Sequence, residues 1–456
     1  MSNTKTSHLF IDDTLPSSQA KQRYKKRRET LLTQVNAPIL LVGITHSPNH
    51  THVWSSLNSY IYQEPSLLYY TGINQIRTAL LLIPGHPHTL FIDEKNPKKE
   101  FWEGLHLGYG TQESEAEITE ITGISSIKPF DELALTIQSF LQETTPKTIY
   151  TLWHTDAKNK AIKDSNYLTK TQLTRWIKTS SPTTTLQNIS LIMWPQRLNL
   201  DETDIQNMIT ANQMTATAFK NTLSHLPKMT SETQISARIN YEIATQSHFG
   251  NSFPSIVASG QNATILHYTQ NNAPTDKANL LLLDFGTRFQ SINADISRTV
   301  PLSGKFNPLQ KALYNFVLQT QKEVEANAKP GTTFKDLNQL AWATLHQRVS
   351  NFITNHSGKM TLSYDAQPHN IGHFLGLQVH DGDPSRKYRN TPFVPGNCIT
   401  SEPGLYGHFT ATIDGQKYNE WIGIRIEDNL LITPTGCQNL STSCPKEIDE
   451  LEGLIS

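Results

Sequence analysis

The sequence contains little cysteine and no long apolar segment. Its 456 residues include only three cysteines, Cys398, Cys437 and Cys444, an odd number whose spacing matches no zinc pattern. A disulfide framework is therefore not expected, and a reducing compartment fits best. No apolar run approaches the roughly 18 residues of a membrane helix, and the first twenty residues lack the apolar core of a signal peptide. We therefore expect a cytoplasmic protein that does not enter a membrane.

A strong net charge is also missing. Lys and Arg together number 39 and Asp and Glu 40, which leaves a net charge of −1. No global charge attracts the chain to nucleic acid or to an anionic membrane, so we expect neither as a partner. The one basic run, Lys21–Arg28, is more typical of the solvated face of a helix than of a nucleic-acid patch.

The pattern of elements changes midway along the chain. A predicted helix at 18–35 is followed by strand-like runs at 38–43, 78–83, 88–93 and 148–153, and the PGHP turn makes the second and third a candidate hairpin. This alternation predicts an α/β domain over residues 18–195. Residues 196–456 combine helices at 201–226, from Asn307-Pro308 to Pro330-Gly331, and at 334–352 with strands at 280–288, 295–302, 399–406 and 423–433. This second domain is predicted to be α+β.

Two aspartates mark the first of these strands and its neighbour. Asp284 directly follows four leucines, and Asp295 comes eleven residues later. If residues 280–302 form a tight hairpin, the odd spacing places the two carboxylates opposite each other, where they repel unless a cation lies between them. In the alternative, Asp284 caps a turn and Asp295 begins the next strand.

Further candidate ligands lie downstream in similar apolar surroundings. His369, His373 and His380 fall within twelve residues, and Glu402 and Glu427 lie in strand-like runs. Alone, each has an ordinary explanation as a core histidine or a salt bridge. Together, oxygen-rich donors with one imidazole are typical of two divalent metals bridged by carboxylates, and the donor types allow Mn, Fe, Co or Zn. The predicted set is Asp284, Asp295, His373, Glu402 and Glu427.

Five stretches of the second half carry a family resemblance. They are SIVASGQNATILHYTQNN, LLLLDFGTRFQSINADISRTVPLSGKF, HNIGHFLGLQVHD, SEPGLY and GIRIEDNLLIT. In order and rough spacing they resemble the Xaa-Pro aminopeptidase (aminopeptidase P) branch of the pita-bread metallopeptidases, a group that includes prolidase, methionine aminopeptidase and creatinase. QRYKKRRETLL, YYTGIN and FWEGLHLG look like the first domain of bacterial aminopeptidase P. The resemblance implies a pita-bread catalytic domain.

The resemblance also assigns metal ligands. It implies that Asp284 chelates one metal and that Asp295 and Glu427 bridge both. His373 and Glu402 would complete the shell of the other metal. The family suggests two divalent ions, Mn²⁺ in particular.

Other residues acquire expected roles by the same resemblance. His267 and His380 would bind the scissile carbonyl and its developing charge. His369 and Arg425 would lie near the pocket or behind the ligands. Trp102 matches a tryptophan that reaches a neighbouring subunit's site in tetrameric members, so we expect a homo-oligomer, a dimer or a tetramer.

The expected activity is release of the first residue from peptides with proline at the second position. We hypothesise that a hydroxide shared by the metals attacks the carbonyl of the first residue and that Glu402 carries a proton to the proline nitrogen. Two alternatives remain at this point. A prolidase of the same fold would cut only dipeptides, and a non-catalytic peptide- or protein-binding module would have lost the metals.

Overall fold

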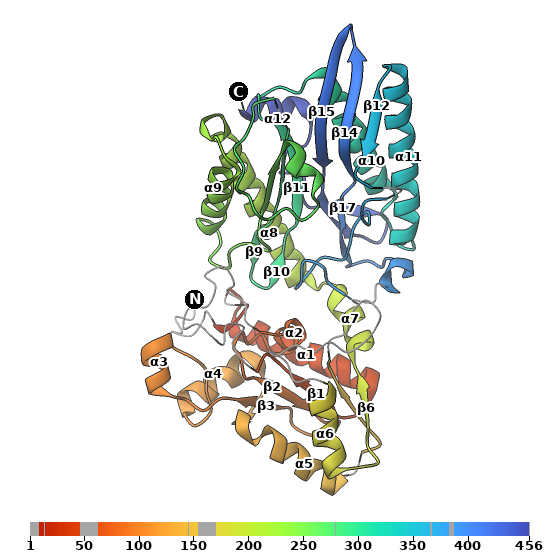
Figure 1. The fold of residues 1–456 in the computed structure, drawn as a ribbon. Coiled ribbons are helices and arrows are strands. Elements are labelled where there is room, and N and C mark those ends of the chain that lie inside the picture. Colours follow the sequence, from red (N-terminus) through yellow and green to blue (C-terminus); the bar gives the residue numbers. More distant parts are fainter. Residues whose placement is uncertain are drawn as a thin grey trace. The chain divides into compact units, whose positions relative to one another are not determined.

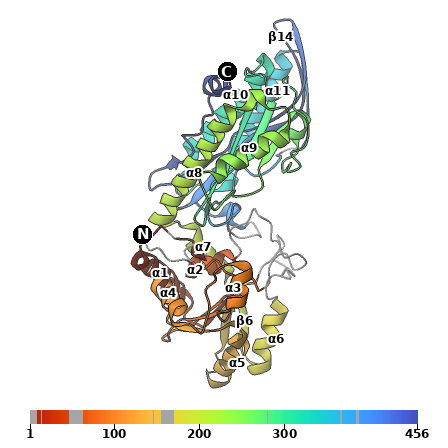
Figure 2. The same cartoon turned by 90° about the vertical axis from the view of Figure 1, so that its left-hand side faces the viewer.

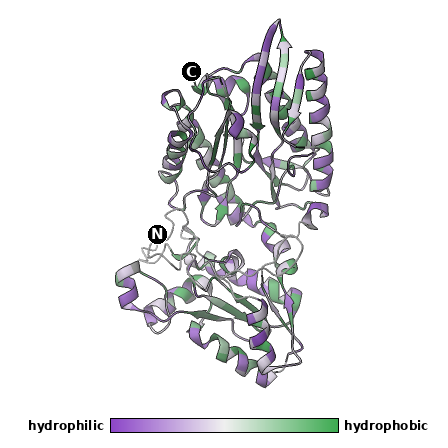
Figure 3. Cartoon of the chain, viewed as in Figure 1, coloured by the Kyte–Doolittle hydropathy of each residue, from purple (hydrophilic) through white to green (hydrophobic). Residues whose placement is uncertain are grey.

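The computed structural model describes residues 9–12, 14–45, 63–144, 146–153, 170–278, 280–364, 367–382 and 387–455. The chain divides into two compact units, Met1–Arg197 and Leu198–Asp381 with Lys387–Ser456 (Figure 1). Each unit encloses its own hydrophobic core. In Figure 3 the hydrophobic residues gather on the strands inside each unit, and the hydrophilic ones on the outer helix faces.

The first unit is built on a six-stranded mixed sheet in the order β4-β3-β2-β1-β5-β6. The predicted hairpin is confirmed, because β2 and β3 are antiparallel with Leu80 opposite Leu90. Strand β1 is buried along its whole length, as expected for a central strand covered on both faces. The elements are α1 (Ser17–Val35), β1 (Ile39–Val42), α2 (Pro65–Thr71), β2 (Ala79–Leu82), β3 (Thr89–Ile92), α3 (Pro97–Glu103), α4 (Gln112–Thr122), β4 (Ser126–Pro129), α5 (Leu133–Thr144), β5 (Thr148–Thr151), α6 (Lys170–Ser180), β6 (Thr185–Asn188) and α7 (Ser190–Leu198).

The basic run of α1 is only partly the solvated face that its composition predicts. Lys25 and Lys26 are exposed, but Arg28 is completely buried. Its guanidinium donates hydrogen bonds to the carbonyls of Tyr70 and Thr122 at 2.9 and 2.7 Å. Arg28 therefore ties α1 to α2 and α4 inside the unit.

The second unit is α+β, as predicted. Its strands form three three-stranded sheets, β11-β8-β7, β12-β14-β15 and β13-β16-β17, and the β9-β10 ribbon. Figure 2 shows α8 and α9 side by side, and α10 packs against α11. The elements are α8 (Glu202–Leu223), α9 (Glu232–Ala244), β7 (Ile256–Ser259), β8 (Leu280–Phe285), β9 (Arg288–Phe289), β10 (Ile292–Asn293), β11 (Ile296–Pro301), α10 (Pro308–Asn327), α11 (Phe334–Asn355), β12 (Lys359–Leu362), β13 (Cys398–Ser401), β14 (Gly404–Ile413), β15 (Gln416–Arg425), β16 (Asp428–Ile432), β17 (Cys437–Asn439) and α12 (Ile448–Ile455).

Capping residues define where the long helices begin. Asp201 accepts the Asp204 N–H at the start of α8, and Asn307 accepts the Gln310 N–H at the start of α10, both at 3.0 Å. These starts agree with the sequence. Helix α8 ends at Leu223, earlier than the predicted residue 226, and a 3-10 turn (Leu226–Lys228) follows.

The predicted tight hairpin over residues 280–302 is wrong. The β9-β10 ribbon comes between β8 and β11 in the sequence, while β8 and β11 pair directly with each other. In that pairing Asp284 lies opposite Ser297 and not opposite Asp295. Asp295 directly precedes β11 and lies two residues before Ser297, so alternation continued past the strand end directs it to the side of Asp284, whose charge acts on it. The two aspartates therefore still lie close together, although they are not paired across the strands.

Two predicted strands are each interrupted. Residues 399–406 divide into β13 and β14 around Glu402, and residues 423–433 divide into β15 and β16 around Glu427. Pro403 has no N–H for a ladder, which accounts for the first break. Both glutamates therefore lie at strand ends and not inside strands. None of the helices in the described part of the chain has the length and apolar character needed to cross a membrane.

Candidate metal centre

Four carboxylates from separate strand ends meet inside the second unit. Burial, and then the charges of Asp284 and Glu402, raise the pKa of Asp295 well above its usual range. Burial and the charge of Glu427 do the same to the pKa of Glu402, and burial and the charge of Asp295 to that of Glu427. Carboxyl groups so placed repel one another when ionised, so their charges call for a cation.

His373 adds a nitrogen donor to this cluster. Donor atoms of Asp295, His373 and Glu427 all lie within 4.8 Å of one another. His373 Nε2 is 3.5 Å from Asp295 Oδ2 and 3.7 Å from Glu402 Oε1. Its Nδ1 lies 3.0 Å from the Phe374 carbonyl oxygen, which fixes the proton there and leaves Nε2 with a free lone pair. Burial lowers the pKa of His373 to about 4, so the ring is neutral near pH 7.

Arg425 holds one side of Asp284. Its guanidinium donates to Asp284 Oδ2 at 2.6 Å, to Ser297 Oγ at 2.8 Å and to the Tyr406 hydroxyl at 3.1 Å. Ser297 in turn donates to Glu427 at 2.8 Å. Among the described residues nothing bonds to Asp284 Oδ1, although it is buried. An orphaned carboxylate oxygen among repelling carboxylates and a neutral imidazole fits the donor set of a divalent-metal site.

The other predicted histidines lie around the same centre. His369 Nε2 is 3.0 Å from the Tyr406 hydroxyl, and His369 Nδ1 is 3.5 Å from Glu402. Burial and the charge of Arg425 lower the pKa of His369 to about 3. His380 is exposed, and its ring centroid lies 4.1 Å from that of His373.

His267 and Trp102 occupy more open positions. His267 is exposed, but its chain neighbours Leu266 and Tyr268 pack in one hydrophobic cluster with Tyr406. The Tyr406 hydroxyl lies within hydrogen-bond distance of His369 and Arg425, so the segment that carries His267 borders the centre. The second unit thus brings together all nine of its predicted site residues. Trp102 belongs to the first unit, on α3.

Sequence reasoning missed the small polar residues that hold the ligands. Thr400 Oγ1 accepts the His373 N–H at 3.1 Å and lies 3.4 Å from Glu402 Oε1. Ser297 links Arg425 to Glu427 in the same way. One signal could have found Thr400: it lies on β13, two residues before Glu402, so alternation continued past the strand end directs both side chains the same way. Threonines and serines are too common in this sequence to stand out otherwise.

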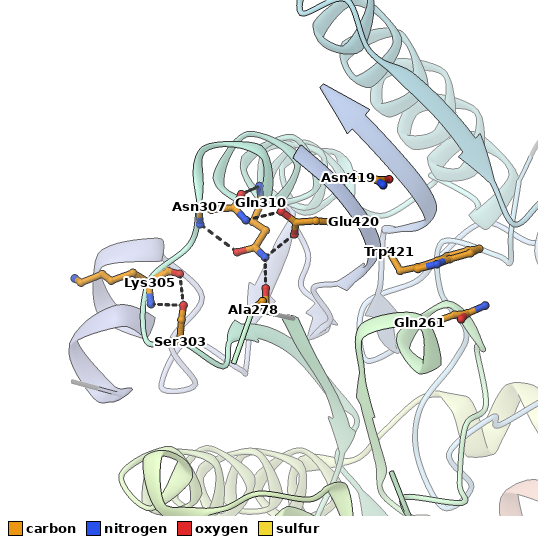
Figure 4. Close-up of a pocket in the computed structure, with 9 residues that line it drawn as sticks. All are labelled: Gln261, Ala278, Ser303, Lys305, Asn307, Gln310, Asn419, Glu420 and Trp421. Carbon is orange, nitrogen blue, oxygen red and sulfur yellow. Dashed lines mark hydrogen bonds between the residues drawn. The ribbon is translucent and has the colours of Figure 1, made fainter. Parts of the chain in front are cut away.

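A separate cavity of about 530 Å³ lies in the same unit and is lined by none of the predicted site residues (Figure 4). Glu420 accepts hydrogen bonds from the side chains of Asn307 and Gln310. Gln310 also donates to the Ala278 carbonyl at 3.0 Å. These polar groups are hydrogen-bonded to one another, so we assign them a structural role in the lining of the cavity.

The fold and this carboxylate-histidine centre define the class of a metallopeptidase. A model of metallopeptidase family M24 matches residues 206–434, and one of the aminopeptidase P N-terminal domain matches residues 24–150. The chain belongs to metallopeptidase family M24.

Similar proteins span nearly the whole chain. It is 29% identical to the Xaa-Pro aminopeptidase of Haemophilus influenzae over 460 residues, which cover 96% of this chain and 97% of that protein. It is 28% identical to rat Xaa-Pro aminopeptidase 3 over 469 residues, 98% of this chain and 88% of that one. The structure of zinc-substituted Escherichia coli aminopeptidase P in complex with product matches with a TM-score of 0.80 and 25% identity, covering 95% of this chain and 98% of that one.

Proposed function

We propose that this protein is a metal-dependent aminopeptidase that releases the first residue of peptides with proline at the second position. The observation that carries the proposal is the buried set of donors from Asp295, His373 and Glu427, which lie within 4.8 Å of one another. Relatives similar over almost their whole length are Xaa-Pro aminopeptidases, which supports this substrate class over that of a prolidase.

Five residues are the proposed ligands of two divalent ions, for which we favour Mn²⁺. They are Asp284, Asp295, His373, Glu402 and Glu427, which together would hold the ions. When bound, the ions would supply an activated water and a Lewis acid for the carbonyl. The orphaned Asp284 Oδ1 and the free Nε2 of His373 support this assignment.

The protein's own groups then have separate tasks around the scissile bond. A bond before proline is a tertiary amide without an N–H, so the site must recognise the carbonyl and the ring instead. The exposed imidazoles of His267 and His380 would hold the carbonyl oxygen. Glu402 would carry a proton to the proline nitrogen. The Asp284 side of the centre would bind the free amine, which makes the enzyme an exopeptidase.

A peptide-length series tests the substrate class. We expect cleavage of Gly-Pro-Pro and longer Xaa-Pro peptides in the presence of Mn²⁺, and no cleavage of matched peptides with alanine at the second position. Cleavage restricted to the dipeptide Gly-Pro would indicate a prolidase. Absence of cleavage with every peptide, in protein that binds Mn²⁺, would favour a binding module.

Exposed aromatic residues and free thiols bear on the assembly and on the compartment. Phe101 and Trp102 on α3 are 84% and 76% exposed, and large aromatic side chains this exposed are typical of contact surfaces, which supports a homo-oligomer. The three cysteines are free thiols, which supports a reducing compartment such as the cytoplasm.

A further inference from the structure

A buried carboxylate outside the metal centre organises the segment that carries His267. Glu232 is the first residue of α9 and is completely buried. Its Oε1 accepts the Ser259 N–H at 2.8 Å, the Ser259 hydroxyl at 3.1 Å and the Asn262 amide at 3.0 Å. Its Oε2 accepts the Tyr268 hydroxyl at 2.8 Å and the Ala273 N–H at 3.0 Å. One carboxylate therefore accepts five hydrogen bonds.

These five bonds fix both ends and the middle of one segment, residues 259–273. Within it the regular structure is a short 3-10 turn, Gly260–Thr264, so few ladder bonds hold it. Tyr268 is buried and directly follows the exposed His267. The hydrogen bond from the Tyr268 hydroxyl to Glu232 therefore fixes the residue next to His267. The position of His267 thus depends on what Tyr268 is bonded to.

We propose that Glu232 is a positioning residue of the peptidase: its carboxylate sets the place of His267 at the edge of the metal centre. The inference rests on the proposed function, because it acts through the substrate role given to His267. None of the five hydrogen bonds of Glu232 joins it to a proposed metal ligand or to a histidine of the site.

The chemistry of the site requires a carboxylate. A glutamine of the same shape offers one acceptor oxygen and one amide that donates. In either orientation its NH₂ would face donors from Ser259 and Asn262, or from Tyr268 and Ala273. At least two buried donors would then lose their acceptor, and the segment would shift. Glu232→Gln is therefore a nearly isosteric change with a large expected effect.

The test is a double-mutant cycle on the Mn²⁺-loaded full chain, with a Gly-Pro-Pro substrate. We expect Glu232→Gln to lower kcat/KM by about tenfold or more, because small misplacements of substrate-binding groups have large rate effects. In a His267→Ala background, Glu232→Gln should lower kcat/KM by less than roughly twofold, because the imidazole through which Glu232 acts is already absent. Affinity for Mn²⁺, measured by calorimetry, should stay within about twofold of wild type, since the ligands are untouched.

A matched control lies on the same helix. Glu242 of α9 is also buried and bonds the Asn221 amide at 2.9 Å and Arg238, away from the His267 segment. Glu242→Gln should leave kcat/KM unchanged. If Glu232→Gln does not fold, Tyr268→Phe removes one donor without adding one. It should lower kcat/KM by roughly threefold, and this loss should also vanish in the His267→Ala background.

Equal losses from Glu232→Gln in the presence and absence of His267, or unchanged kcat/KM in the folded variant, would overturn the inference. For Tyr268→Phe the same two outcomes would overturn it. If wild-type protein loaded with Mn²⁺ cleaved no Xaa-Pro peptide, the proposed function would fail first, and this inference with it. The wild-type rate therefore separates the two failures.

Discussion

Arg298 offers the sharpest stability prediction, because it is fully buried and its bonds join the metal centre to the C-terminal segment. Nη2 donates to Asp428 Oδ1 at 2.7 Å and to the Cys444 carbonyl at 2.8 Å. Nη1 donates to the Glu427 carbonyl at 2.7 Å, and Nε to the Pro445 carbonyl at 2.9 Å. Although burial alone would raise the pKa of Asp428, the charges of Arg298 and Lys446 lower it to about 2, so the pair stays ionised.

Arg298→Met keeps most of the side-chain volume and removes the charge and all these donors. Asp428 would keep Lys446 as a cation, but the carbonyls of Glu427 and Cys444 would lose a donor. Breaking a buried ion pair by removing one partner costs about 3–5 kcal/mol. Because whole domains are stable by only about 5–15 kcal/mol, the second unit should become marginal at 37 °C.

The assay is urea unfolding with circular dichroism, with and without Mn²⁺. The transition that Mn²⁺ shifts reports the second unit. Arg348→Met is the matched control, because Arg348 pairs with Glu323 where the side chains are 28% and 37% exposed, and its loss should stay below about 1 kcal/mol. A loss for Arg298→Met no larger than this control would refute the reasoning.

Three further predictions address other parts of the chain. Burial and the charge of Arg28 lower the pKa of His88 to about 4, so the folded first unit disfavours the protonated ring. Lowering the pH from 6.5 to 4 should therefore destabilise this unit by about 1–2 kcal/mol, a figure reduced for solvent screening of the half-buried ring. His88→Gln should flatten this pH dependence of unfolding, and an unchanged slope would contradict the prediction. Glu402→Ala should lower kcat by about 100-fold or more in a Gly-Pro-Pro assay, and full turnover with normal metal content would refute its role. Trp102→Ala should shift the protein to a smaller assembly in light scattering, whereas an unchanged mass would argue against α3 as the contact.

The sequence predicted elements well where the pattern is local. Alternation and apolar runs located β1, β2 and β3, and caps located the starts of α8 and α10. The β9-β10 ribbon was missed because two-residue strands carry no periodicity, and this error gave the wrong partner for Asp284. Arg28 was expected in water because its acceptors, carbonyls of Tyr70 and Thr122, come from distant segments that the local pattern does not reveal.

In the candidate site, too, residue type and local context reveal some features, and contacts between distant segments determine the rest. Carboxylates in apolar surroundings are conspicuous one by one, so Asp284 and Glu427 could be selected from residue type and context. That they meet His373 is a tertiary fact. Donor type and apolar surroundings suggest the grouping, and the family resemblance assigns each member its role. The residues that hold the ligands, Ser297 and Thr400, have side chains too ordinary to be selected from one sequence.

The most direct test of the metal centre is to count bound Mn²⁺ per chain by mass spectrometry while the cleavage of Gly-Pro-Pro is followed. We expect about two ions per chain, loss of cleavage on exhaustive chelation, and recovery when Mn²⁺ is restored. Asp295→Asn should bind fewer ions and cleave poorly. Undiminished cleavage by a chain that holds no metal would contradict the account.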